Sequence, residues 1–154
     1  MITRLFMNTR VTEIYRAEND TTVSLSLYES GVSAGFPSPA EDFAQKSLDL
    51  NEHLIKHPAA TYFVRVQGAS MQSAGIFDGD LLVVDKALEP WDGCIVIADV
   101  SGEFVVKRLK IQGNRIWLVP ENERYKPIFL EGDMTLTIWG VCTHVIHQLG
   151  QKGK

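Results

Sequence analysis

The sequence predicts a mainly β protein: a curved, largely antiparallel β body with a short N-terminal arm and one or two short helices. Hydrophobic residues are 45% and charged residues 22% of 154, an ordinary globular composition with enough chain for one core. From Thr61 onward, short apolar or alternating runs are separated by turn residues, a spacing typical of such β bodies. The predicted strands are residues 61–66, 81–85, 94–100, 103–110, 116–120, 134–138 and 140–146.

Turn residues separate these strands and support the prediction. Ser101-Gly102 and Gly113-Asn114 are two-residue hairpin signals, and Asp92-Gly93 marks a further turn. Asp78 and Asp80 flank a glycine, and turn chemistry explains both better than a metal site or a pair of catalytic carboxylates.

Two capping signals predict the helices. Residues 38–41, Ser-Pro-Ala-Glu, form a capping box with proline at the first helical position, which predicts a helix to about Lys46. Asp49 opens a second box, and the helix that follows should end at His57-Pro58. His53 and His57 are four residues apart, but the sequence lacks the glutamate of the zinc-protease motif, so they are interpreted as solvated helix histidines. A metal role is not expected for His144 and His147 either.

Residues 1–34 form the predicted arm. Thr21 to Tyr28 alternates apolar and polar side chains, which predicts a half-buried strand that must lie on the body or on a partner chain. A loop rich in Gly, Ser and Pro then joins the arm to the body at residues 29–39. The arm is too short for a helix-turn-helix domain.

Bulk properties exclude several classes of protein. The net charge of −4 and the pI near 5.5 argue against autonomous DNA binding. No apolar run reaches the length of a membrane span or of a signal-peptide core, so we expect a cytoplasmic protein. Cys94 and Cys142 each sit in an apolar run and are interpreted as small buried hydrophobic residues.

A serine and a lysine are the candidate catalytic residues. Ser70 follows a predicted strand and Gly68, a position at which a hydroxyl is presented rather than packed, although most turn serines are ordinary. Lys107 shares a strand face with Val105 and Leu109, where desolvation would lower its pKa and make the amine a base for Ser70. Arg108 points to the opposite face, which is also apolar, so periodicity leaves open which basic residue faces inward.

Three motifs carry a resemblance to UmuD-type mutagenesis proteins, which are relatives of the LexA-type self-cleaving repressors. They are GASM at residues 68–71, DGDLLVVD at 78–85 and GEFVVKRL at 102–109, and the resemblance extends from about Gly35 to His147. It implies a body like those of LexA and the signal peptidases, with Ser70 as nucleophile and Lys107 as general base. It also places the self-cleavage site at Ala34-Gly35, ahead of residues 36–39, Phe-Pro-Ser-Pro.

The resemblance further implies a self-cleaving serine peptidase of the SOS response. A RecA–single-stranded DNA filament would stimulate the cut, releasing residues 1–34 from the peptidase-like domain 35–154. The product would be a homodimer that serves an error-prone Y-family polymerase of the UmuC type, without a cofactor or metal, a membrane contact or sequence-specific DNA binding of its own. Backbone N–H groups of Ser70 and Met71 are expected to hold the oxyanion. The alternative is a polymerase-binding module with a vestigial serine–lysine pair.

Overall fold

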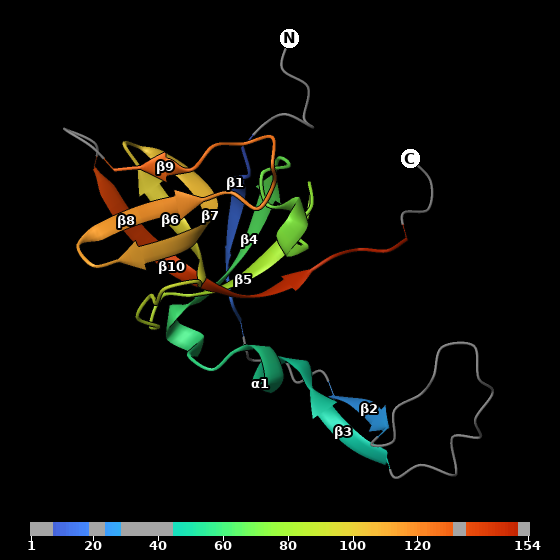
Figure 1. The fold of residues 1–154 in the computed structure, drawn as a ribbon. Helices are drawn as coiled ribbons and strands as arrows, with labels where there is room; N and C mark the ends of the chain where they lie inside the picture. The colour runs from blue at the N-terminus through green and yellow to red at the C-terminus, as the bar shows by residue number, and fades with distance from the viewer. Residues whose placement is uncertain (1–7, 19–23, 29–44, 131–134, 151–154) are drawn as a thin grey trace.

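The computed structural model describes residues 8–18, 24–28, 45–130 and 135–150, with only the backbone described for residues 24–28 and 45–46. Its elements are the strands β1 Arg10–Arg16, β2 Ser24–Tyr28 and β3 Gln45–Asp49, the helix α1 Leu50–Leu54, then β4 Thr61–Gln67, β5 Leu81–Asp85, β6 Ile95–Val100, β7 Glu103–Gln112, β8 Arg115–Val119, β9 Ile128–Phe129 and β10 Leu136–Ile146. The predicted mainly β, antiparallel fold is therefore confirmed (Figure 1).

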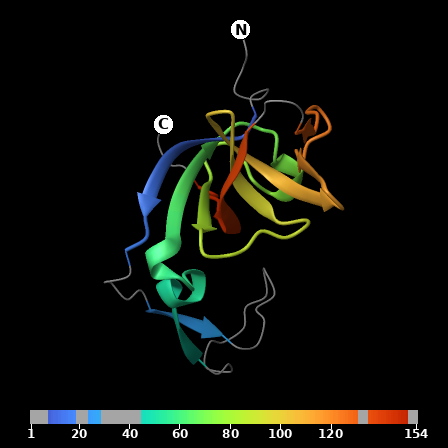
Figure 2. The same cartoon turned by 90° about the vertical axis from the view of Figure 1, so that its left-hand side faces the viewer.

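An eight-stranded antiparallel sheet forms the body. Its strand order is β1-β4-β5-β10-β6-β7-β8-β9, and an additional pairing of Arg10 in β1 with Val105 in β7 joins the two sides of the sheet. Six of the strands therefore close into a barrel, with β8 and β9 as an extension. Figure 2 shows β1, in blue, running beside β4, in green.

Two clusters of buried side chains form the core on either side of the curved sheet. Val64, Met71 and Val106 belong to one cluster, and Val105 and Leu109 belong to the other. Consecutive residues of β7 thus pack on opposite faces, both of which are buried. This explains why hydrophobic periodicity in β7 could not predict which of its two faces points inward.

Both two-residue hairpins form as predicted. Ser101 and Gly102 connect β6 to β7 with positive φ angles of 49° and 91°, the combination that a type I′ turn requires. Gly113 connects β7 to β8 with a φ of 60°. The two strands predicted at 134–138 and 140–146 are instead one strand, β10, whose register shifts between Ile138 and Gly140.

The helix predictions are partly right. Asp49 caps α1, its Oδ1 accepting hydrogen bonds from the N–H groups of Asn51 and Glu52, but the helix ends at Leu54, before the predicted stop at His57-Pro58. The helix predicted to end at Lys46 is wrong at that end, because Gln45 and Lys46 belong to β3. Cross-strand pairing of Gln45 with Tyr28 of β2 overrides the local capping signal there. Residues 38–44 lie outside the described residues.

The arm is built differently from the prediction. Ser24–Tyr28 is a strand, but it pairs with β3 in a separate two-stranded sheet, which Figure 1 shows beyond α1 and away from the body. The arm segment that lies on the body is β1, which was not predicted. A register shift between Val11 and Glu13 interrupts its alternation, and most of its side chains are exposed, so hydrophobic periodicity carries no signal.

Gly140 is the glycine of β10 that close packing requires. A Cβ atom built there would lie 2.6 Å from Val84 Cγ1, a buried side-chain atom of β5. Gly140→Ala should therefore lower the free energy of unfolding by about 1–3 kcal/mol, the usual cost of overpacking. Gly150→Ala, with open space around the position, is the matched control for denaturant titrations. Equal stability of the two variants would contradict this packing argument.

Candidate active site

Ser70 is held in a turn that immediately follows β4. Gly68 makes the turn with a φ of 116°, and its N–H donates to Asp78 Oδ1 at 2.9 Å. The far side of the turn is fixed by residues after β8: the N–H of Glu121 donates to the Ser70 carbonyl, and Asn122 Nδ2 donates to the Ala69 carbonyl at 2.8 Å. Ser70 thus lies on a backbone anchored from two directions, as a precisely placed hydroxyl requires.

Lys107 of β7 reaches Ser70. Its Nζ lies 2.9 Å from Ser70 Oγ, and both residues are fully buried. Arg108 points the other way, where its side chain pairs with Glu121 and donates to the Gly93 carbonyl. The structure therefore brings together the predicted serine and lysine, and it answers the question left open between Lys107 and Arg108.

Burial changes the acid–base chemistry of this lysine. Removal of the ammonium from water lowers the pKa of Lys107 from 10.5 to about 8, and the negative charge of Glu103 opposes that shift. A lysine with such a pKa is partly neutral near physiological pH. Its lone pair can then accept the proton of a serine hydroxyl at hydrogen-bond distance, which is the chemistry of a general base.

The hydroxyl of Ser70 is not presented to solvent, contrary to the prediction from its turn position. The exposed fraction of the residue is 0%, and Thr9 contacts its hydroxyl while Asn8 contacts Lys107 beside it. The N–H of Thr9 donates to Ser70 Oγ at 2.8 Å, and Lys107 Nζ donates to Asn8 Oδ1 at 2.9 Å. Sequence reasoning missed both residues, since neither belongs to a motif or to a periodic run.

Two backbone groups beside Ser70 are available as donors. Within the described part of the chain, no hydrogen bond occupies the N–H groups of Ser70 and Met71, whereas the carbonyl of Met71 accepts from Ala74 and Ile76. Free N–H groups at a nucleophile are what an oxyanion hole needs. The Ala34-Gly35 bond lies outside the described residues, so its position relative to Ser70 stays a prediction.

The cysteines are not alternative nucleophiles. Both are free thiols: Cys94 is buried in one core cluster, as predicted, and Cys142 is only partly buried against the other. Burial raises the pKa of each thiol, which disfavours the reactive thiolate.

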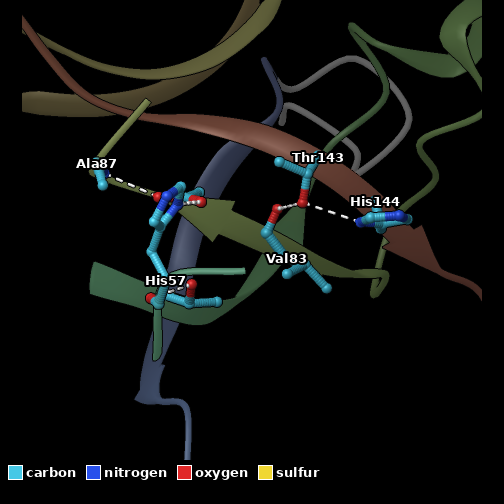
Figure 3. A network of polar contacts seen from close by, with 7 residues as sticks. His57, Val83, Ala87, Thr143 and His144 are labelled. Atoms are coloured by element: carbon cyan, nitrogen blue, oxygen red, sulfur yellow. Dashed lines mark hydrogen bonds and ion pairs between the residues drawn. The ribbon is translucent and has the colours of Figure 1, made fainter. Parts of the chain in front are cut away.

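His57 and His144 have polar side-chain partners on β5 and β10, respectively. His57 lies beyond the end of α1 rather than on the helix, and its Nδ1 is 2.5 Å from the buried Asp85 carboxylate (Figure 3). His144 contacts the Thr143 hydroxyl, whose Oγ1 donates to the Val83 carbonyl. The interpretation of His57 as a helix residue is therefore wrong, although its side chain is exposed as predicted.

Asp78 and Asp80 form turn hydrogen bonds, as predicted from the sequence. Asp78 accepts from the N–H of Gly68, and Asp80 accepts from the N–H of Phe77 and contacts His147. Among the described residues, no group of three or more His, Cys, Asp or Glu side chains could hold a metal ion. Nor does this part of the chain contain a helix long and apolar enough to cross a membrane.

Comparison with known proteins identifies the family. A family model described as Peptidase S24-like matches residues 26–143. The chain belongs to the Peptidase S24-like family. It is also similar to Protein SamA of Salmonella typhimurium strain LT2, at 49% identity over 122 residues, covering 79% of this chain and 84% of SamA. The UmuD-type resemblance is thereby confirmed.

Two further relatives show the breadth of the similarity. Protein MucA of Escherichia coli is 44% identical over 122 residues, covering 79% of this chain and 83% of MucA. The LexA repressor of Acidithiobacillus ferrooxidans is 46% identical over 118 residues, covering 75% of this chain but only 57% of the repressor. Ser70 and Lys107 lie inside the S24-like range, whereas Asn8 and Thr9 precede it.

Lys107→Met tests the effect of burial on the lysine. The pKa of about 8 in the folded chain lies below the 10.5 of the unfolded chain, so the unfolded chain binds more protons between these values. The free energy of unfolding should therefore rise with pH across this window, by about 3 kcal/mol in total. Lys107→Met should lose that rise and be no less stable than the parent chain at neutral pH.

Denaturant titrations between neutral pH and pH 10.5 would measure this difference. Lys110→Met, at an exposed position of the same strand, is the matched control and should keep the rise. Clear destabilisation of Lys107→Met at neutral pH would show instead that the lysine is charged and paired.

Proposed function

We propose that this S24-like protein is a serine peptidase that cleaves its own chain between Ala34 and Gly35. The observation that carries the proposal is the buried contact of 2.9 Å between Ser70 Oγ and Lys107 Nζ, with the pKa of the lysine lowered to about 8. A buried amine beside a serine hydroxyl has no evident structural purpose, since burial of a lysine costs free energy that a methionine would not.

The reaction would proceed in two halves. Neutral Lys107 takes the proton of Ser70, Oγ attacks the Ala34 carbonyl carbon, and the N–H groups of Ser70 and Met71 stabilise the oxyanion. Lys107 then gives its proton to the departing amine of Gly35, leaving residue 34 esterified to Ser70. Water, deprotonated by Lys107, hydrolyses that ester and restores both side chains.

The proposal extends to regulation and partners. The cut would separate residues 1–34 from 35–154 in the cytoplasm, on stimulation by a RecA–single-stranded DNA filament during the SOS response. The processed homodimer would then act as accessory subunit of a UmuC-type Y-family polymerase. The similarity to UmuD-type proteins supports this part of the proposal, together with the location of Ser70 and Lys107 in the S24-like range.

A polymerase-binding module with a vestigial Ser70–Lys107 pair is the second candidate. One observation favours it: both residues are fully buried, and Asn8 and Thr9 occupy the space beside them. The two candidates differ in a single result, which is whether the pure protein produces a fragment that begins at Gly35.

Ser70→Ala should abolish that fragment while the chain stays folded, although loss of Oγ leaves the Thr9 N–H and Lys107 Nζ without this acceptor and should lower the free energy of unfolding by about 1–3 kcal/mol. The parent chain, incubated at mildly alkaline pH where Lys107 is neutral, should accumulate a product from Gly35 to Lys154 that mass spectrometry identifies. Ser73→Ala, in the exposed 3₁₀ turn that follows Ser70, is the matched control and should cleave normally. If the Ser70→Ala variant still produced a fragment starting at Gly35, Ser70 would not be the nucleophile.

Cleavage should also loosen β1. This strand pairs with β4 from Arg10 to Arg16, and a cut at residue 34 makes that attachment bimolecular, so its effective concentration falls from about millimolar to that of the free fragment. Hydrogen exchange of β4 amides should accelerate in the self-cleaved product compared with uncut Ser70→Ala, while β6 stays unchanged. The partner that distinguishes the two forms should bind the exposed β4 edge, and equal exchange in both would contradict this mechanism.

A further inference from the structure

The segment from Asn8 to Val11 lies over the Ser70–Lys107 pair as part of the closed barrel. Three hydrogen bonds fix its first two residues: Thr9 N–H to Ser70 Oγ at 2.8 Å, Lys107 Nζ to Asn8 Oδ1 at 2.9 Å, and Val106 N–H to the Thr9 carbonyl at 2.9 Å. Arg10 then pairs with Gln67 on one side and with Val105 on the other. The segment therefore fills the gap between the end of β4 and the middle of β7.

We propose that residues 8–11 are an inhibitory segment, which blocks Ser70 against any peptide and must leave before the chain can cleave itself. The proposal rests on the self-cleaving function proposed above and adds how self-cleavage is regulated. Since Ser70 is fully buried with the segment in place, a scissile peptide reaches Oγ only when Asn8 and Thr9 have moved away. The loop that contains Ala34-Gly35 and the inhibitory segment thus compete for one place in the same chain.

The segment is bound in a geometry that prevents its own cleavage. A peptide group is planar, and the Thr9 N–H that points at Ser70 Oγ places this oxygen near the plane of the Asn8–Thr9 bond. A nucleophile must approach a carbonyl carbon from above that plane. The next carbonyl, that of Thr9, accepts a hydrogen bond from Val106 and is not directed at the N–H groups of Ser70 and Met71.

The segment also opposes activation of the pair. Ser70 Oγ accepts hydrogen bonds from Thr9 and from Lys107, and a hydroxyl oxygen has two lone pairs. Both are occupied, so none is free to attack. The side-chain Oδ1 of Asn8 accepts a hydrogen bond from Lys107 Nζ, and this bond is stronger when the lysine is charged and therefore unable to act as a base.

The inhibitory segment is attached to the body less stably than its burial would allow. Thr9 is fully buried, and within the described part of the chain its Oγ1 has no hydrogen-bond partner, a defect that costs about 1–3 kcal/mol. The strand that follows is mostly exposed, and its register shifts between Val11 and Glu13. An unsatisfied hydroxyl at buried Thr9 weakens the attachment of the segment to the body, which is of use only to a segment that must detach.

Two substitutions at Thr9 should act in opposite directions. Thr9→Pro removes the N–H that caps Ser70 Oγ and keeps the backbone extended, so it should release the segment. Thr9→Val removes only the unsatisfied hydroxyl and should bind the segment more tightly. Thr12→Pro and Thr12→Val are matched controls, because Thr12 lies three residues further along the chain, in β1 at the register shift and away from Ser70.

Accessibility of position 70 is measured in full-length Ser70→Cys chains by iodoacetamide labelling, with mass spectrometry resolving each thiol. Relative to Ser70→Cys alone, we expect labelling at position 70 about fivefold faster with Thr9→Pro and about fivefold slower with Thr9→Val. The Thr12 controls should leave the rate unchanged. Cys94 is buried and serves as the control for general unfolding. Its labelling rate should be the same in all five chains. Equal rates at position 70 in all five chains would overturn the proposal.

The second readout is the rate of self-cleavage in chains that keep Ser70. Thr9→Pro should accelerate formation of the Gly35 fragment, and Thr9→Val should slow it, each against its Thr12 control. If labelling follows the expected order but these cleavage rates are equal, the inhibitory role is wrong. If no chain cleaves while labelling still follows that order, the peptidase function fails and the covering of Ser70 by Thr9 stands.

Discussion

The buried contact between Lys107 and Ser70 is the constraint on which the rest of this structure depends. A lysine that is fully buried in a β strand is tolerated only if it loses its charge or finds polar partners. Here its pKa is lowered to about 8, so the charge is lost more readily than from an exposed lysine, and two oxygen atoms lie 2.9 Å from Nζ. β7 supplies the rigid side of this contact, because its residues are packed on both faces. The turn after β4 supplies the other side, and Glu121 and Asn122 hold it in place.

Closure of the barrel connects the N-terminal arm to this contact. Without β1, strands β4 and β7 would each present an unpaired edge directly beside Ser70 and Lys107. An open edge next to a nucleophile is what a peptidase needs in order to bind an extended peptide, and it is also a site of unwanted pairing. The arm satisfies the edge in the uncut chain. The same strand that completes the fold therefore lies beside Ser70, and under the proposed function the stability of the barrel is coupled to inhibition of self-cleavage.

The sequence predicted most of the body and the two central residues of the site. Alternation and hairpin residues located β4 to β8, because these strands have one consistently apolar face and turns of defined chemistry. Spacing alone left Lys107 and Arg108 equivalent, since only the three-dimensional packing shows which face of β7 meets Ser70. β1 could not be predicted because its side chains are exposed and its register shifts at Thr12. Thr9 acts through its backbone N–H and carbonyl, which every residue carries, and Asn8 acts through a side-chain amide that no motif or periodic run marks.

The pKa of Lys107 indicates how strongly the inhibitory segment, residues 8–11, must suppress self-cleavage. With a pKa of about 8, roughly one Lys107 side chain in ten is neutral at pH 7. Under the proposed function, protonation of Lys107 at pH 7 would slow self-cleavage by only about tenfold, which is weak control. A barrier that excludes the peptide altogether is of a different kind, because it acts before chemistry and is removed by a conformational change rather than by a proton. In the proposal made above, Asn8 and Thr9 are that barrier, and a stimulus that detaches β1 would remove in one step both the steric block and the hydrogen bond that favours the charged lysine.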